Sequence, residues 1–183
     1  MDKYKVILVD DEEEVIDVIK QKIAWDQLGF QVVGSATNGV KALELVEKTQ
    51  PDVVITDIKM PYMDGLELSK RLNDDYRNIH IIIFTGFDEF EYAKEAVHLE
   101  VEEYMLKPIN SQELTECLKR VKNSLDVERE EKLNVQKLEN YFNDVLPILQ
   151  NNLFVSLIEG RVDEGEYSKF VDSYKIDFRG PYY

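Results

Sequence analysis

The sequence predicts an α/β fold in which a five-stranded parallel sheet carries helices on both faces and is followed by a helical extension. Two observations lead to this prediction. Short apolar runs alternate with amphipathic helical patterns through roughly the first two thirds of the 183-residue chain. Three of these runs, VILV, VVIT and IIIF, are continuously apolar, which is typical of strands buried on both sides.

The individual elements follow from periodicity and from turn residues. Strands are predicted at residues 5–9, 31–35, 53–56, 79–84 and 103–106, where β-branched and other apolar residues concentrate. Helices are predicted at residues 12–24, 40–49, 66–73 and 90–99, and a fifth helix opens at Ser111. Dipeptides that favour turns, such as Asn38-Gly39 and Asp64-Gly65, lie between these elements. Trp25 is expected to pack where the first helix closes.

The pattern changes after Ser111, and three regions are expected: a domain over residues 1–122, a helical, coiled-coil-like linker over 123–150, and a short helical segment with the start of a middle region over 151–183. Apolar residues recur in two stripes, at Leu114, Leu118, Val121 and Leu125, and then at Leu138, Phe142, Val145 and Leu149. These stripes predict a long helix and dimerisation through it. The polar stretch DVEREEK leaves two separate helices as an alternative, and Pro147 should kink or restart the helix.

Composition excludes several classes of function. The net charge is −15 and no stripe is rich in Lys or Arg, so the chain itself is not expected to bind nucleic acid. Cys117 is the single cysteine, which excludes an intrachain disulfide and predicts a buried helix residue. His80 and His98 lie in no metal-ligand spacing and are expected to be structural. No segment approaches the about 20 apolar residues of a membrane span, so we expect a soluble cytoplasmic protein without membrane contact.

Polar side chains follow the predicted strands at the points where the strands end. Asp10 and Asp11 follow the first strand, and Asp57 follows the third. Thr85 and Lys107 follow the fourth and the fifth. Because the C-terminal ends of parallel strands share one edge of a sheet, we expect these five side chains to gather in one crevice.

Such a crevice has a definite chemistry. Three carboxylates would repel one another unless a cation joined them, and oxygen-only ligands favour a hard ion such as Mg²⁺. Lys107 adds a positive charge, and Thr85 adds a hydroxyl donor. The set therefore suits the binding of a phosphoryl group, with Asp57 as the nucleophile.

Four segments, VDDEEEV, VVITDIKMPYMDGLEL, IIIFTGFDEFEYAKEA and EEYMLKP, occur in this order along the chain. Together they resemble the receiver domain of two-component response regulators, whose fold is flavodoxin-like and of the CheY type. The resemblance implies that a sensor histidine kinase transfers a phosphoryl group to Asp57. It also implies a phosphoacceptor and not an enzyme, with at most slow phosphorylation from small donors and slow loss of the group.

The resemblance extends to individual residues. The Mg²⁺ ion, or Mn²⁺ in its place, would be held by Asp10, Asp11, Asp57 and the backbone carbonyl of Lys59. Thr85 resembles the switch hydroxyl, Lys107 the phosphate anchor and Tyr104 the aromatic switch residue. Pro108 resembles the proline that follows a cis peptide bond. An ordinary half-buried strand aromatic is the alternative for Tyr104.

The segment IAWDQLGFQVVGSATNG, the long helix and the closing GRVDEGEYSKFVDSYKIDFRGPYY resemble transcriptional regulators with a receiver, a helical linker and an AraC-type DNA-binding domain. That domain is absent from the sequence, so we expect a chain truncated before it, or a naturally short chain, and DNA binding only through the absent domain. The resemblance also implies a homodimer, formed by the surface of the fourth helix, fifth strand and fifth helix together with the linker helix.

Two other functions remain as alternatives. A Mg²⁺-dependent phosphohydrolase would use Asp57 as a transient nucleophile, and such enzymes commonly carry a second acid two residues further on. Lys59 occupies that position, which argues against turnover of external substrates. A phosphorylation-independent scaffold would keep the acidic pocket without using it.

Overall fold

The computed structural model describes residues 3–76, 78–86 and 101–161 of the chain. Its five strands form one parallel sheet in the order β2-β1-β3-β4-β5. The strands are β1 (Tyr4–Val9), β2 (Phe30–Ala36), β3 (Val53–Asp57), β4 (His80–Thr85) and β5 (Glu103–Leu106). The predicted α/β class is confirmed, and the helix predicted at residues 90–99 lies outside the described residues.

The sheet is buried on both faces because successive side chains of a strand point to opposite sides. In β1, Val6 and Leu8 contribute to one apolar cluster, while Ile7 and Val9 contribute to the other. β4 divides in the same way, with Ile82 in the first cluster and Ile81 and Ile83 in the second. Two apolar layers therefore need two layers of helices to cover them.

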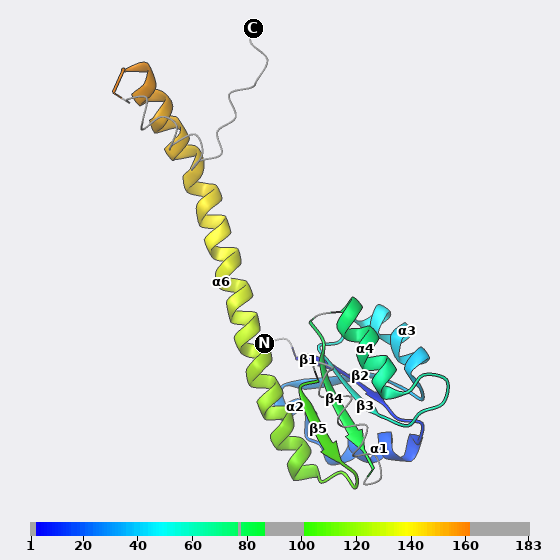
Figure 1. Cartoon of the computed structure of the whole chain (residues 1–183). Helices are drawn as coiled ribbons and strands as arrows, with labels where there is room; N and C mark the ends of the chain where they lie inside the picture. Colours follow the sequence, from blue (N-terminus) through cyan, green and yellow to red (C-terminus); the bar gives the residue numbers. More distant parts are fainter. Residues whose placement is uncertain (1–2, 77, 87–100, 162–183) are drawn as a thin grey trace. The chain divides into compact units, whose positions relative to one another are not determined.

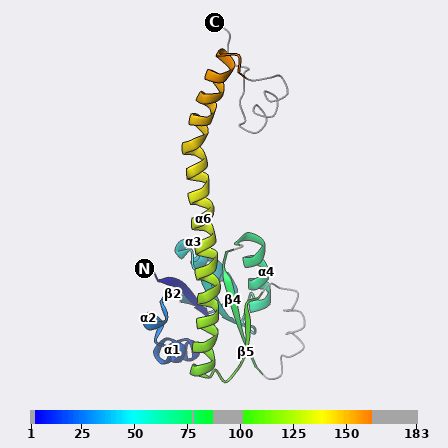
Figure 2. The same ribbon diagram turned by 90° about the vertical axis from the view of Figure 1, so that its left-hand side faces the viewer.

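The described helices supply those layers (Figure 1). They are α1 (Glu13–Lys22), α2 (Trp25–Leu28), α3 (Gly39–Thr49), α4 (Gly65–Asp75) and α6 (Ser111–Ile158). α3 and α4 cover one face of the sheet, and α1, α2 and the first part of α6 cover the other (Figures 1 and 2). α3 and α4 begin with side-chain caps: Asn38 accepts from the Lys41 amide and Asp64 accepts from the Glu67 amide.

One helix boundary was predicted wrongly. The sequence predicted a single helix over residues 12–24, whereas α1 ends at Lys22 and Ile23 is extended before α2 begins. Residues two positions apart on a helix point in nearly opposite directions. Interrupting the helix allows both Ile23 and Trp25 to enter the same apolar cluster, where each is buried. Trp25 therefore has the packing role that was predicted, in a helix of its own.

α6 is a single helix that includes Pro147, so both the alternative of two helices and a restart at Pro147 are wrong. The first predicted dimer stripe is also corrected. Leu114, Leu118, Val121 and Leu125 are buried in the apolar cluster beneath α1 and α2, as is Cys117. Apolar residues that complete the core of their own domain are not available to a second chain, so this stripe does not mediate dimerisation.

The chain divides into two compact units, Met1–Leu125 and Asp126–Tyr183. The first contains the sheet and the helices on both of its faces, and it holds the candidate functional site. The described part of the second is the remainder of α6 and the turn that follows it. Among the described residues, no helix combines the length and the apolarity required to cross a bilayer.

Candidate functional site

Asp10 and Asp57 are held at the C-terminal ends of the two neighbouring strands β1 and β3. Asp10 follows β1 directly, and its amide donates to the Ala36 carbonyl at the end of β2. One carboxylate oxygen of Asp10 accepts from the Glu12 amide at 2.9 Å, which fixes the side chain. Asp57 is the last residue of β3. Because the chain crosses from β2 past β1 to β3, the two acids lie where the strand order reverses, the usual ligand position in open α/β sheets.

Asp11 completes a group of three carboxylates. One carboxylate oxygen from each of Asp10, Asp11 and Asp57 lies within 4.8 Å of the other two. Asp10 and Asp57 are buried and Asp11 is exposed, so the group opens to solvent on one side. Hard oxygen ligands with an open side fit Mg²⁺, which keeps part of its water shell in proteins. The residues present therefore fit the ion that the sequence predicted.

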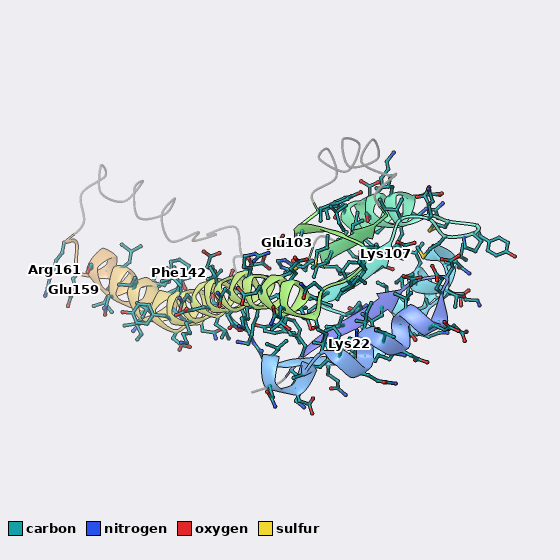
Figure 3. The ribbon with its side chains drawn as sticks, turned by 90° about the horizontal axis from the view of Figure 1, so that it is seen from below. Lys22, Glu103, Lys107, Phe142, Glu159 and Arg161 are labelled. Carbon is teal, nitrogen blue, oxygen red and sulfur yellow. The ribbon has the colours of Figure 1, made fainter. Side chains whose placement is uncertain are left out.

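Lys107 brings a cation to these acids from the end of β5. Its Nζ lies 3.0 Å from Asp10 Oδ2 and 2.9 Å from Asp57 Oδ1, and its position beyond β5 is labelled in Figure 3. Partial burial of Lys107 tends to lower its pKa, but hydrogen bonds to Asp57 and Asp10 and their charges outweigh it, so the pKa is raised. The ammonium group is therefore charged throughout the physiological range and partly neutralises two buried carboxylates.

The turn after β3 approaches Asp57 so closely that it requires a glycine. The Gly65 amide donates to the Ile58 carbonyl at 2.8 Å. A Cβ built on Gly65 would lie 2.0 Å from the carbonyl oxygen of Asp57, far inside van der Waals contact. The sequence predicts only a turn at Asp64-Gly65. The role of Gly65 in seating Asp57 was missed because the approach of two backbone segments leaves no trace in local composition.

The remaining predicted residues lie at or near this edge. Thr85 ends β4 opposite Leu106 of β5. Tyr104 pairs with Ile83, is half-buried against the α3 and α4 side of the sheet, and has a buried hydroxyl oxygen. Lys59 follows β3 in the turn, with an exposed side chain. The peptide bond between Lys107 and Pro108 is cis.

His80 is not part of this site. His80 begins β4, at the opposite end of the sheet, and its Nδ1 lies 3.0 Å from a carboxylate oxygen of Glu102. The other oxygen of Glu102 accepts from the Ser124 hydroxyl of α6 at 3.0 Å. Within the described residues, His80 joins no group of metal ligands. His98 lies outside the described residues.

Comparison with known families decides what this arrangement is. The sequence model of the response regulator receiver domain matches residues 6–119. The chain belongs to the response regulator receiver family. The matched span includes the three acids, Lys107 and all five strands of the sheet except the first residues of β1. This receiver is therefore part of a two-component signalling system.

Two curated relatives extend the likeness beyond the receiver. The chain is 37% identical over 157 residues to the uncharacterized transcriptional regulatory protein YesN of Bacillus subtilis, with 86% of the chain and 43% of the relative covered. It is 31% identical over 168 residues to the transcriptional regulatory protein HptR of Staphylococcus aureus, with 91% of the chain and 66% of the relative covered. The chain thus spans between about two fifths and two thirds of the length of these relatives.

Solved structures agree with the fold of the receiver. The REC domain of AraT, a response regulator from Geobacillus stearothermophilus, is 41% identical with a TM-score of 0.66, covering 69% of this chain and 98% of that one. A two-component transcriptional regulator AraC from Clostridium phytofermentans is 30% identical with a TM-score of 0.65, again covering 69% of this chain and 98% of that one.

Proposed function

We propose that Asp57 of this receiver accepts a phosphoryl group from the phosphohistidine of a sensor histidine kinase. The observation that carries the proposal is the grouping of the Asp57 carboxylate with the Lys107 ammonium, at 2.9 Å, and with the acids Asp10 and Asp11. In the transfer, an Asp57 oxygen forms a bond to phosphorus as the bond from phosphorus to the donor imidazole nitrogen breaks. The leaving nitrogen departs with the electron pair of that bond.

The metal site would be formed by the three carboxylates and the Lys59 backbone carbonyl. A bound Mg²⁺, or Mn²⁺ in its place, supplies positive charge that stabilises the transferring phosphoryl oxygens. Lys107 attracts the same oxygens from the β5 side. Asp57 is oriented by its place at the end of a fully paired strand and by the close packing of Gly65 on its carbonyl.

Phosphorylation would act as a switch because it changes the charge next to Lys107. A phosphoryl group adds roughly two negative charges and new acceptor oxygens. Lys107 can then bind phosphoryl oxygens in place of carboxylate oxygens, and the Thr85 hydroxyl can donate to them. We infer that Tyr104, two positions from Thr85 in the ladder between β4 and β5, responds to this change by repacking, which shifts an equilibrium between two packings of the β5 region.

The output would be control of transcription in the bacterial cytoplasm. The relatives named above are transcriptional regulators that are longer than this chain. We infer a receiver over residues 1–122, a linker over 123–150 and the start of a middle region over 151–183. An AraC-type DNA-binding domain would follow residue 183 in a longer protein. Dimerisation would use the surface of residues 90–99, β5 and the solvent-facing side of the first part of α6, together with the linker helix.

Intact mass measurement after incubation with acetyl phosphate and Mg²⁺ tests the proposal. We expect one stable phosphoryl adduct on the wild-type chain, no adduct on Asp57→Asn, and no adduct when Mg²⁺ is chelated. Continued release of inorganic phosphate over many turnovers would indicate a phosphohydrolase instead. A wild-type chain that remains unmodified by acetyl phosphate, and also by a phosphorylated kinase, would support a silent scaffold.

A further inference from the structure

The distal part of α6 presents a strict seven-residue repeat on one face. Along this face the intervals alternate between four and three residues, and the positions are Asn134, Leu138, Tyr141, Val145, Ile148, Asn152 and Val155. Positions with this spacing lie on one stripe of an α-helix, and a stripe that keeps a seven-residue period is the packing seam of a left-handed coiled coil. We call these seven residues the distal seam.

Most apolar residues of the distal seam are exposed, and Val145 is half-buried. Leu138 is 69% exposed, Tyr141 67% and Ile148 60%. On the adjoining side of the same helix, Leu149 is half-buried and Leu153 is buried. The sequence predicted a stripe that ran through Phe142 and Leu149. Tyr141 is more exposed than its neighbour Phe142, at 49%, and Ile148 is more exposed than the half-buried Leu149, so the distal seam runs through Tyr141 and Ile148.

We propose that the distal seam pairs with the same seam of a second copy of this chain, as a parallel, in-register two-stranded coiled coil. This deepens the dimer of the proposed function by naming its contact residues and their register. It uses residues of the second compact unit alone, and it does not require phosphorylation of Asp57, because most of the seam is already exposed without it.

The two asparagines argue for a second copy and for one register. In a parallel, in-register pair Asn152 faces Asn152 of the other helix, and Asn134 faces Asn134, so the amides can hydrogen-bond to each other. A shift by one repeat would place Asn152 against Val145. An antiparallel pair would place it near Leu138. Either arrangement would bury an amide against an apolar side chain without a partner, which costs free energy.

A charged residue limits the distal seam at its N-terminal end. The preceding position of the repeat is Glu131, and two copies would bring like charges together there. Pairing is therefore expected from Asn134 to Val155, a length of about 32 Å at 1.5 Å per residue. Within this span no seam position carries a charged side chain. Figure 3 shows the side chains of this part of α6, with Phe142 labelled on the flank of the seam.

Disulfide formation between single cysteines tests both the contact and its direction. In the full chain, Leu138→Cys and Val155→Cys each place a thiol on the seam, and Asn143→Cys places one on the opposite, exposed face. Under mild oxidation we expect covalent dimers from the two seam variants and not from Asn143→Cys. The wild-type chain is the blank, because Cys117, its single cysteine, is fully buried.

The cross-linking result discriminates between arrangements. In an antiparallel pair the two copies of residue 138 would be separated by about 14 residues along the helix, or about 21 Å, and Leu138→Cys could not link to itself. Linking at Val145→Cys without linking at Leu138→Cys would therefore overturn the parallel register. Equal linking of Asn143→Cys and Leu138→Cys would overturn the seam itself.

Sedimentation measures the association without a covalent bond. We expect Ile148→Lys to weaken the dimer at least tenfold, and Leu133→Lys, which makes the same kind of change at an exposed position off the seam, to leave it unchanged. Both variants should keep wild-type helicity by circular dichroism. A wild-type chain that sediments as a monomer at every concentration would overturn the proposal, as would coverage of the seam by another part of a longer chain.

The outcome is independent of the proposed phosphotransfer. Ile148→Lys should still take up a phosphoryl group from acetyl phosphate, and Asp57→Asn carrying Leu138→Cys should still form the disulfide dimer. A Leu138→Cys chain with Asp57 intact that forms the cross-link but takes up no phosphoryl group counts against Asp57 as acceptor. Loss of the cross-link with retention of the adduct counts against the seam.

Discussion

Lys107 Nζ lies 2.9 Å from Asp57 Oδ1, although the two residues are fifty positions apart in the sequence. The same nitrogen lies 3.0 Å from Asp10 Oδ2, so one ammonium group bridges acids from two neighbouring strands. Asp10 and Asp57 are both buried, and burying a carboxylate costs free energy unless a counter-charge or hydrogen bonds compensate it. The cation is therefore part of the stability of the site as well as part of its chemistry.

Replacing Lys107 with Met should destabilise the metal-free protein and tighten Mg²⁺ binding. The change keeps the aliphatic stem and leaves two buried carboxylates without their cation, which we expect to lower the free energy of unfolding by about 2 to 4 kcal/mol. Removing a positive charge beside the acids should raise their Mg²⁺ affinity by about tenfold, or about 1.4 kcal/mol. Urea unfolding with and without Mg²⁺, together with a Mg²⁺ titration, measures both effects.

Lys119→Met provides the matched control for that variant. Lys119 pairs with Glu116 at 3.6 Å on the exposed side of α6, and both side chains are more than half exposed. Exposed pairs of this kind contribute about 0 to 1 kcal/mol, so stability should hardly change and Mg²⁺ affinity should not change. Equal effects of the two substitutions would mean that the ion pairs of Lys107 with Asp10 and Asp57 contribute no more to stability or to Mg²⁺ affinity than an exposed ion pair does.

Gly65→Ala should damage the site through the backbone. The new Cβ would lie 2.0 Å from the Asp57 carbonyl oxygen, so the turn or the end of β3 must move. We expect a loss of about 2 to 4 kcal/mol in unfolding free energy, the range of an overpacked buried position, and a lower yield of phosphoryl adduct. Gly34→Ala is the comparison, because its Cβ would meet the flexible end of Leu45 and the resulting loss should be smaller.

Cys117 should resist alkylation in the folded protein. Burial, and to a lesser extent the charge of Glu103, raises the pKa of its thiol from 9.0 to about 12. At pH 8 this alone makes the reactive thiolate about 1,000-fold rarer than in the unfolded chain. Iodoacetamide labelling followed by mass should be slow in buffer and complete in urea. Rapid labelling of the folded chain at pH 8 would contradict the burial of the first part of α6.

The same shift sets the direction of a pH effect on stability. The unfolded thiol loses its proton above about pH 9, whereas the folded thiol keeps its proton until about pH 12. The contribution of Cys117 to folding is therefore fully present below pH 9 and is lost as the pH rises toward 12. Comparison with Cys117→Ala over this pH range isolates the effect, since the alanine variant lacks the titrating group.

Glu102→Ala should separate stability from phosphotransfer. Glu102 bonds His80 of β4 and Ser124 of α6, at the end of the sheet opposite Asp57. Loss of both contacts should lower the unfolding free energy by about 1 to 2 kcal/mol, and the phosphoryl adduct on Asp57 should form as in the wild type. A strong loss of adduct in a folded Glu102→Ala protein would show that the two ends of the sheet are coupled.

Much of the fold was predictable because its causes are local. Continuous apolar runs marked β1, β3 and β4, and each observed strand differs from its predicted range by no more than a residue at either end. The break between α1 and α2 was not predictable, because it depends on the position of Ile23 and Trp25 relative to a core built by distant segments. Burial of the stripe from Leu114 to Leu125 was not predictable for the same reason, because these residues pack into the same core.

In the candidate site, too, some features were predictable from the sequence and others depend on contacts made only after folding. The parallel arrangement of strands required Asp10, Asp11 and Asp57 to share an edge, and the structure brings them within 4.8 Å of one another. The direct bridge from Lys107 follows from its place at the end of β5. The requirement for glycine at position 65 could not be predicted, since it arises from two backbone segments that meet only after folding.

The position of β5 in the sheet has a mechanical consequence. β1 and β3, which carry Asp10 and Asp57 at their ends, each lie between two other strands, whereas β5 is an edge strand of the described sheet and pairs with β4. The proposed phosphorylation would therefore add charge at the end of a central strand, while Tyr104 lies in an edge strand and Lys107 directly follows it. If the proposed switch moves β5, the movement would disturb the pairing of β5 with β4 and leave the ladders that join β1, β3 and β4 in place.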